Sequence, residues 1–544
     1  MPRVTPQTLP VPALLAGLLL LAQPGCRAGD DLSFAEAGPV AGEAGRGSFT
    51  FGAATAAAQI EEGNEHADWW VFTQPESEGG LGKGTFVGDA VEGYSRALED
   101  LALIEELGLD AYRFSINWAR IEPERDVIDA TAVAHYGEVI DGLVAAGVKP
   151  MLTVHHFSSP IWVDDPRQSA CPATETDTNL CGWDGPHVDA VIAELAELAG
   201  MLAAEYGDRV DEWCTVNEPI NYLIAAYGIG QFPPGGNLLL GDIGNGNLEG
   251  TTRVIKNYLR AHVAIYEAIA ANDTIDADGD GVAANIGLTL NINEWQPWGP
   301  DADDVMVVSE HPDDVRAAEN VEYVYHHVFV DALVHGEFDN DLDRVREEAQ
   351  PDWEGKIDFV GVQYYARIPV TGASSMLIPR VDGMICFAGL SALGGFGDEC
   401  PSAGDATHWV PDMHYEYWEP GLYNILADFG SRWPDLPITV TESGLATHTG
   451  ARRAEHVVRS LEQIAQARDE GIDVRGYYHW SLMDNFEWAE GYEPRFGLYT
   501  VDRSTFARTP TEGATLYAQI TAAREITGEQ RETYGGLGPM TPEE

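Results

Sequence analysis

The feature that most constrains the fold is a regular alternation of short apolar runs with long amphipathic stretches. The amphipathic stretches, such as 93–107, 131–146 and 189–206, carry apolar residues at helical spacing. Eight apolar runs precede such stretches: 48–55, 111–117, 149–156, 212–218, 285–292, 358–365, 436–443 and 474–482. Because strands that are apolar throughout are buried on both faces, the pattern predicts an α/β fold, a (β/α)8 TIM barrel. A doubly wound open sheet is the alternative.

The acidic composition limits the partners of the chain. Its 544 residues contain 88 Asp and Glu against 31 Lys and Arg, which gives a net charge of -57. Nucleic acid and anionic lipid surfaces would repel such a polyanion, so neither is expected to bind it. Because barrels often run long as one unit, we expect a single catalytic domain at 48–528 with a polar C-terminal tail at 529–544.

The N-terminus has the layout of an export signal. Arg3 precedes an apolar stretch, 11–22, that is too short to span a bilayer. Cys26 follows a small residue, as at bacterial lipoprotein processing sites. We therefore expect residues 1–26 to be a signal, Cys26 to be lipidated, and 27–47 to be a flexible tether; a plain signal peptide is the alternative. The protein would be exported, and either anchored to a bacterial membrane by lipid or periplasmic or extracellular.

The remaining cysteines agree with an oxidising compartment. Cys171 and Cys181 share one long loop, 164–185, and Cys386 and Cys400 share another, 367–415. Two local disulfides would each stabilise one loop by roughly 2–4 kcal/mol. Cys214 stands inside an apolar run and is expected to be a buried free thiol. In a barrel the two long loops would form the rim of a pocket.

Polar residues stand at the C-terminal ends of seven of the eight predicted strands, where barrel enzymes carry their chemistry. So many polar groups would destabilise a buried core, because each one left unpaired would cost on the order of 1–3 kcal/mol of folding free energy. Their concentration at one end of the barrel predicts a functional site. The residues are Gln59, Arg113, Asn117, His155, His156, Asn217, Glu218, Gln363, Tyr365, Glu442, Trp480, Glu487 and Trp488.

Two of these residues, Glu218 and Glu442, are carboxylic acids that end separate strands. Two acids across a pocket are what cleavage of a glycosidic bond requires, one protonated to release the leaving oxygen and one ionised. Arg113 and Tyr365 could hold one of them ionised. The pattern therefore indicates a glycoside-cleaving enzyme.

The chain resembles glycoside hydrolase family one, the β-glucosidase-like barrels, from about Phe49 to Tyr517. Several long motifs in matching order carry the resemblance: "FTFGAATAAAQIEEG", "YSRALEDLALIEELGLDAYRFSINWARIEP", "TVHHFSSP", "TVNEP", "DFVGVQYYARIPV", "TVTESG" and "GYYHWSLMDNFEWAEGYEPRFGLYTVD". The resemblance implies a retaining β-glycosidase that forms a covalent glycosyl-enzyme and needs no cofactor for catalysis. Its substrate would be a small oligosaccharide or β-glucoside with a terminal non-reducing β-D-glucosyl or closely related unit.

The resemblance also implies roles for individual residues. Glu218 would be the acid/base and Glu442 the nucleophile, with Arg113 and Tyr365 orienting Glu442. Asn217 would bind the sugar 2-hydroxyl, and Tyr415 stands where a tryptophan usually stacks on the aglycone. His155 would be a packing neighbour. The remaining sugar contacts would come from Gln59, His156, Trp480, Glu487 and Trp488.

Two alternatives to hydrolysis remain open. An inactive surface carbohydrate-binding protein would keep the pocket but lack a carboxylate, and neither carboxylate is missing. A transglycosylase would differ only in whether sugar or water intercepts the intermediate, which the sequence does not decide.

The stretch "DADGDG", 276–281, matches the first half of a calcium loop. Asp276, Asp278 and Asp280 alternate before Gly281, but Gly287 stands where a bidentate Glu would complete the loop. A structural calcium site is one interpretation, and a solvated acidic turn is the other.

Overall fold

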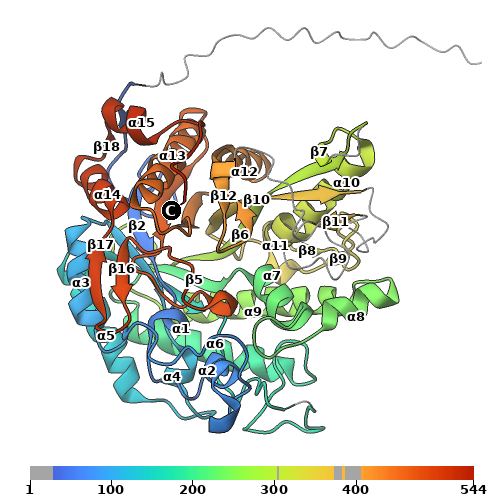
Figure 1. Ribbon diagram of the computed structural model, residues 1–544. Helices are drawn as coiled ribbons and strands as arrows, with labels where there is room; N and C mark the ends of the chain where they lie inside the picture. The colour runs from blue at the N-terminus through green and yellow to red at the C-terminus, as the bar shows by residue number, and fades with distance from the viewer. Residues whose placement is uncertain (1–28, 169, 303–305, 373–382, 386–405, 544) are drawn as a thin grey trace, which may run out of the picture.

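The computed structural model describes residues 29–168, 170–302, 306–372, 383–385 and 406–543. Its centre is a closed ring of eight parallel strands (Figure 1). β15 pairs with β2, and β10 pairs with both β6 and β14, so the ring has no open edge. This confirms the predicted barrel. In ring order the strands are β2 (Thr50–Ala54), β3 (Ala111–Ser115), β4 (Lys149–His155), β5 (Glu212–Asn217), β6 (Asn285–Pro300), β10 (Phe359–Thr371), β14 (Ile438–Ser443) and β15 (Val474–Trp480).

Helices surround the barrel, as the amphipathic stretches predict (Figure 1). α5 shows how the sequence starts such a helix, because the side chain of Asp129 accepts hydrogen bonds from the backbone of Thr131 and Ala132. The main helices are α3 (Ala97–Glu106), α5 (Ala130–Ala145), α6 (Val188–Tyr206), α9 (Glu249–Asn272), α10 (Pro312–Glu322), α11 (Val328–His335), α12 (Glu419–Arg432), α13 (Gly450–Asp469) and α14 (Glu512–Ala523).

Shorter elements fill the connections. The helices are α1 (Ala57–Ile60), α2 (Asp68–Thr73), α4 (Trp118–Ile121), α7 (Pro219–Tyr222), α8 (Leu238–Asn245) and α15 (Gly528–Tyr534). The strands are β1 (Leu32–Ser33), β7 (Met306–Val308), β8 (Glu337–Phe338), β9 (Glu348–Ala349), β11 (Met384–Ile385), β12 (Trp409–Val410), β13 (Tyr415–Glu416), β16 (Tyr499–Asp502), β17 (Ala507–Pro510) and β18 (Glu525–Ile526).

Two barrel strands continue beyond the apolar runs that predicted them. β6 has 16 residues and β10 has 13, and they remain paired as far as Val370 and Pro297. Antiparallel strands then join this extension, with β7 on β6 and with β11 and β13 on β10. The extension forms part of the rim above the C-terminal end of the barrel, where the long loops were expected to lie.

The N-terminal segment differs from the tether expected at 27–47. From residue 29 onward it packs on the domain: β1 pairs with β18, and the backbone N–H of Phe34 donates to Arg524 O at 2.8 Å. Val40 and Ala41 are buried in an apolar cluster with residues near the starts of barrel strands, including Ala111 and Met151. Apolar burial therefore holds this segment in place, and residues 29–47 belong to the barrel domain.

The C-terminal residues also pack on the domain. Residue 528, the expected domain boundary, starts helix α15. Met540 is buried, and the Glu543 carboxylate accepts hydrogen bonds from Thr447 Oγ1 at 2.6 Å and from His448 N at 2.7 Å. The segment 529–543 is therefore part of the folded unit.

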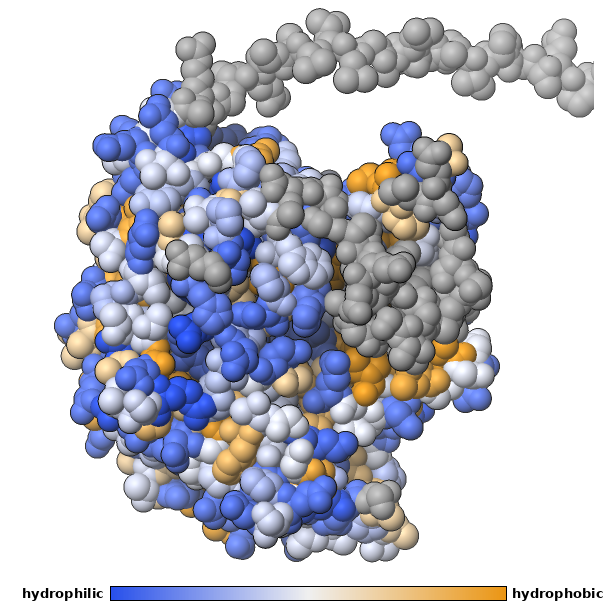
Figure 2. Space-filling view, viewed as in Figure 1, coloured by the Kyte–Doolittle hydropathy of each residue, from blue (hydrophilic) through white to orange (hydrophobic). Residues whose placement is uncertain are grey.

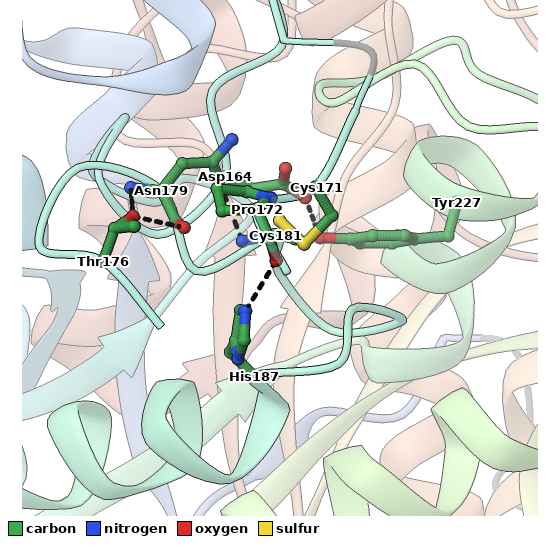
Figure 3. The surroundings of a disulfide bond; sticks show 8 residues. All are labelled: Asp164, Cys171, Pro172, Thr176, Asn179, Cys181, His187 and Tyr227. Atoms are coloured by element: carbon green, nitrogen blue, oxygen red, sulfur yellow. Dashed lines mark hydrogen bonds between the residues drawn. A yellow bond between two sulfur atoms is a disulfide. The ribbon is translucent and has the colours of Figure 1, made fainter. Parts of the chain in front are cut away.

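Cys171 and Cys181 form a disulfide in the rim loop after β4, as predicted (Figure 3). His187 Nε2 lies 3.0 Å from the carbonyl oxygen of Pro172, which fixes the loop to the start of α6. Cys214 is a buried free thiol. Cys386, Cys400 and Cys26 lie outside the described residues.

In the part of the chain that the structure describes, no helix combines the length and the apolar character that a membrane span requires. The face of the molecule shown in Figure 2 is mainly hydrophilic, in line with the acidic composition.

Candidate active site

The C-terminal ends of the barrel strands surround a pocket of about 190 Å³. Nine of the predicted site residues line it: His156, Asn217, Glu218, Tyr365, Tyr415, Glu442, Trp480, Glu487 and Trp488. Gln59 and Arg113, the other two residues that were assigned a role in sugar binding or catalysis, are fully buried behind the lining and contact residues in it. The structure therefore brings together all eleven residues that were assigned such a role, whereas Asn117 and His155 do not line the pocket.

Glu218 follows the last residue of β5. Its backbone adopts a left-handed conformation with φ of 41°, a strained geometry for a residue with a side chain, and Pro219 begins α7 directly afterwards. The carboxylate accepts hydrogen bonds from two neutral amides, Asn221 Nδ2 at 2.8 Å and Asn291 Nδ2 at 3.4 Å. Burial, reinforced by the nearby Glu442 carboxylate, raises the pKa of Glu218 to about 8. Glu218 is therefore protonated at neutral pH.

Glu442, in β14, has a different environment. One carboxylate oxygen accepts a hydrogen bond from the buried guanidinium of Arg113, and the other accepts one from the hydroxyl of Tyr365 at 2.7 Å. Burial raises the pKa of Glu442, whereas Arg113 and Tyr365 lower it. Because Glu442 has a cationic partner and Glu218 has only amides, a proton shared between the two acids resides on Glu218.

Asn217, the last residue of β5, is held by its neighbours. Its Oδ1 accepts hydrogen bonds from Arg113 Nη2 at 2.7 Å and from Gln363 Nε2 at 2.8 Å. Oδ1 also accepts from the Thr289 hydroxyl at 3.0 Å. These donors point the amide nitrogen of Asn217 towards His156 Nε2, which lies 3.0 Å away. The side chain is thus fixed in one orientation at the pocket wall.

Polar atoms that could bind a ligand lie around the far side of the pocket. Gln59 Nε2 donates to the carbonyl oxygen of Phe486 at 2.7 Å and to the Glu487 carboxylate at 3.3 Å. The buried Oε1 of Gln59 and Nδ1 of His156 have no hydrogen-bond partner among the described residues. Burial lowers the pKa of His156 well below its usual range, so its ring is neutral. A sugar hydroxyl can both donate to and accept from such a set.

Aromatic side chains form the pocket floor and walls. Trp480 ends β15 and is buried, and the Trp488 ring lies 5.8 Å from the His156 ring. Tyr415, at the start of β13, reaches the pocket from the rim extension. His155 is buried with its Nε2 3.1 Å from Ser159 Oγ and does not line the pocket, as expected of a packing residue.

Sequence reasoning missed the residues that bind Glu218. Asn291 lies in the fifth predicted strand, the one strand to which no site residue was assigned, and its position was the available signal. Asn221, on α7, is one helical turn beyond Glu218 and accepts a hydrogen bond from the Tyr325 hydroxyl at 3.1 Å. Tyr325 and Asn293 also line the pocket.

The stretch 276–281, with its partial calcium-loop motif, lies away from this site, in the connection that leads into the start of β6. Asp276 and Asp278 face Asp211, a residue that the prediction did not include. Asp280 instead accepts hydrogen bonds from Val282 N at 2.7 Å and Asn285 Nδ2 at 3.0 Å. The three alternating aspartates therefore do not form the acidic cluster by themselves.

The sequence and the structure of the chain were compared with those of known proteins. The model of "Glycosyl hydrolase family 1" matches residues 43–526. The chain belongs to glycosyl hydrolase family 1. It is 29% identical to a beta-galactosidase of Pyrococcus woesei, with 88% of this chain and 97% of the relative covered. Identity to beta-glucosidase 4 of Oryza sativa subsp. japonica is also 29%, covering 87% and 94%. The beta-glycosidase structure from Pyrococcus horikoshii superimposes with a TM-score of 0.71 at 28% identity, covering 93% and 100%.

Family 1 membership agrees with the barrel and with the pair of carboxylates at its C-terminal end. The protein is a glycoside hydrolase, and the interpretation as an inactive carbohydrate-binding protein is not favoured. Both carboxylates are present, and they face one pocket in complementary environments.

Proposed function

We propose that the protein removes terminal non-reducing β-D-glucosyl units from small β-glucosides with retention of configuration. The observation that carries this proposal is the unequal environment of the two carboxylates. Glu442 binds a buried guanidinium and a phenol, which suits an ionised nucleophile, whereas Glu218 binds only amides and has a pKa raised to about 8. One acid is thus prepared to attack and the other to donate a proton.

In the first step the Glu442 carboxylate attacks the anomeric carbon and forms a glycosyl ester. The bond to the leaving oxygen breaks with its electron pair, and Glu218 transfers its proton to that oxygen. In the second step Glu218, now ionised, removes a proton from water, and the water oxygen displaces Glu442 from the anomeric carbon. The product keeps the β configuration because two inversions have occurred. Arg113 and Tyr365 hold Glu442 in position through both steps.

Recognition of the sugar falls to the polar atoms and rings around the two acids. Asn217 would bind the 2-hydroxyl, where contacts strengthen towards the transition state. Gln59, His156 and Glu487 would bind the remaining hydroxyls, with Trp480 and Trp488 against the sugar ring and Tyr415 towards the aglycone. The unpartnered Oε1 of Gln59 and Nδ1 of His156 support this assignment.

The composition of the described pocket lining supports a sugar without phosphate. None of the described residues that line the pocket is Lys or Arg, and the lining includes four glutamates, Glu218, Glu442, Glu487 and Glu490. The ionised Glu442 carboxylate would repel a phosphate dianion, and none of the described lining residues offers a positive charge to bind it.

The deciding experiment compares the parent protein with Glu442→Gly on p-nitrophenyl β-D-glucoside, with and without sodium azide. We expect activity in the parent, loss of at least about 1,000-fold in the variant, and recovery with azide that yields α-glucosyl azide. A β-configured azide product would instead mean that Glu442 is not the nucleophile. Parallel assays on β-galactoside and β-fucoside determine the preferred sugar, and product analysis with added acceptor sugar separates hydrolysis from transglycosylation.

We further propose that the protein is exported and that Cys26 carries a lipid anchor. The signal-like residues 1–26 and the disulfide between Cys171 and Cys181 support this proposal. Expression of the full chain in a Gram-negative host with labelled palmitate tests it. Label should appear in the parent and be absent from Cys26→Ala, with export retained in both. An unlabelled exported parent would point to a plain signal peptide.

A further inference from the structure

An acidic cluster lies at the end of the barrel opposite the active-site pocket. One oxygen from each of Asp211, Asp276 and Asp278 lies within 4.8 Å of the others. Asp211 immediately precedes β5, and the two other aspartates belong to the loop that leads into β6. A hollow of about 250 Å³ borders this cluster and is open to solvent. The cluster therefore joins the starts of two neighbouring barrel strands.

An acidic cluster alone does not indicate a ligand, but Asp211 supplies a second observation. Its side chain is 95% buried, since its exposed fraction is 5%. Oδ1 accepts a hydrogen bond from Ala277 N at 2.9 Å, whereas Oδ2 is buried and accepts none from the described residues. A buried carboxylate oxygen that lacks a donor is costly unless a cation binds it. This oxygen belongs to the Asp211 carboxylate, which lies beside the carboxylates of Asp276 and Asp278.

The loop has the first half of an EF-hand sequence but does not supply the last ligand itself. Counted from Asp276, the position of the bidentate Glu is residue 287, a glycine within β6. A Cβ at Gly287 would lie 2.5 Å from the ring of Phe359, so a side chain does not fit there. Asp211, the residue just before the neighbouring strand β5, lies against the same loop and offers the carboxylate that Gly287 lacks.

We propose that Asp211, Asp276 and Asp278 form a calcium-binding site, with Asp211 in place of the final ligand of the loop. Hard carboxylate oxygens from a flexible loop suit Ca²⁺, which accepts irregular geometry, better than Mg²⁺, which requires a near-octahedral set. Lys149 Nζ pairs with Asp278 Oδ2 at 2.7 Å, while the two carboxylate oxygens of the neighbouring Glu212 accept no hydrogen bond from the described residues. On calcium binding the Lys149 ammonium can turn to Glu212 and free Asp278.

The site has a structural consequence for catalysis. The strand that starts after Asp211 ends at Asn217 and leads into Glu218, and the strand after the loop carries Asn291, which binds Glu218. Calcium would hold the starts of these two strands together. We therefore expect an effect on thermal stability and little effect on kcat of the folded enzyme.

The test is isothermal titration of CaCl2 into chelator-treated full-length protein, combined with thermal unfolding. We expect one Ca²⁺ per chain with Kd in the range of about 10⁻⁵–10⁻³ M and a rise in Tm of a few degrees. In both Asp211→Asn and Asp276→Asn, the heat of calcium binding and the calcium-dependent rise in Tm should be absent. The matched control is Asp343→Asn, which removes one charge from another exposed acidic loop and should bind calcium like the parent.

Several results would overturn the proposal. One is the absence of saturable heat in the parent, and another is unchanged binding in both site variants. Equal affinity for MgCl2 would overturn the assignment to calcium. Circular dichroism and hydrolysis of p-nitrophenyl β-D-glucoside by each variant show whether it is folded, and because Asp276 is exposed, its variant remains informative if Asp211→Asn fails to fold.

Discussion

The hydroxyl of Tyr365 lies 2.7 Å from the Glu442 carboxylate and donates a hydrogen bond to the oxygen that Arg113 does not bind. Two strands are needed for this contact, because Tyr365 lies in β10 and Glu442 in β14. The bond favours the ionised carboxylate and so lowers the pKa of Glu442 against the effect of burial. Tyr365, on the neighbouring strand, therefore helps Arg113 to keep the nucleophile ionised.

Tyr365→Phe should lower kcat/KM by about 10–100-fold, the equivalent of a hydrogen bond of about 1.5–3 kcal/mol to a charged acceptor. Because the phenol lowers the pKa of Glu442, its loss raises that pKa, and activity requires the ionised form. The acidic limb of the pH profile of kcat/KM should therefore move to higher pH. The measurement is this profile between pH 4 and 9.

The neighbouring tyrosine provides the control for that experiment. Tyr364 is fully buried and donates to the carbonyl oxygen of Trp418 at 2.5 Å, without lining the pocket. Tyr364→Phe should lower stability and leave the acidic limb unchanged. Equal shifts in both variants would mean that the effect does not pass through Glu442.

Asn221→Ala should move the alkaline limb of kcat/KM to higher pH. The first step requires protonated Glu218, whose pKa is raised to about 8, and the Asn221 amide lowers that pKa by binding the ionised form. Its removal raises the pKa of Glu218, so activity persists to higher pH. With a 2,4-dinitrophenyl glucoside, which needs little protonation of its leaving group, the alkaline limb should be weak in both proteins. An alkaline limb that stays in place with p-nitrophenyl glucoside would contradict the assignment of Glu218 as acid.

Glu487→Ala should lower kcat/KM on p-nitrophenyl β-D-glucoside by about 100-fold, because buried groups that bind a hydroxyl discriminate strongly when the contact is lost. Burial raises the pKa of Glu487, and the side chain is held by Gln59. The measurement compares parent and variant on 3-, 4- and 6-deoxy glucosides. For the deoxy glucoside that lacks the hydroxyl bound by Glu487, kcat/KM of the parent and of the variant should differ by less than about 10-fold. A uniform 100-fold loss on all substrates would indicate a structural role.

Much of this site could be predicted from the sequence, because in a parallel barrel the C-terminal ends of all strands lie at the same end of the barrel. Once eight apolar runs predict a barrel, Glu218 and Glu442 must approach each other, although 224 positions separate them in the sequence. The same rule brought Gln59 and Glu487 together, and they form a hydrogen bond.

What the sequence did not reveal depends on contacts without a repeating pattern. Asp211 reads as an ordinary acidic residue before a strand, and only its unpaired oxygen beside the loop aspartates distinguishes it. The small, acidic and Gly-rich residues 27–47 resemble a linker in composition, yet Val40 and Ala41 are buried at the base of the barrel. The composition of a whole segment therefore does not show that two of its residues are buried.

Val40→Asp should destabilise the protein by about 3 kcal/mol or more, because it places an unpaired carboxylate in an apolar cluster. Val40 is fully buried, and Arg475 fixes the segment through a 2.7 Å hydrogen bond to the carbonyl oxygen of Gly42. Glu36→Ala is the control, since the Glu36 side chain is 94% exposed and its loss should leave the midpoint of urea unfolding unchanged. If Val40→Asp unfolds at the same urea concentration as the parent, the N-terminal segment is a dispensable tether and does not support the barrel.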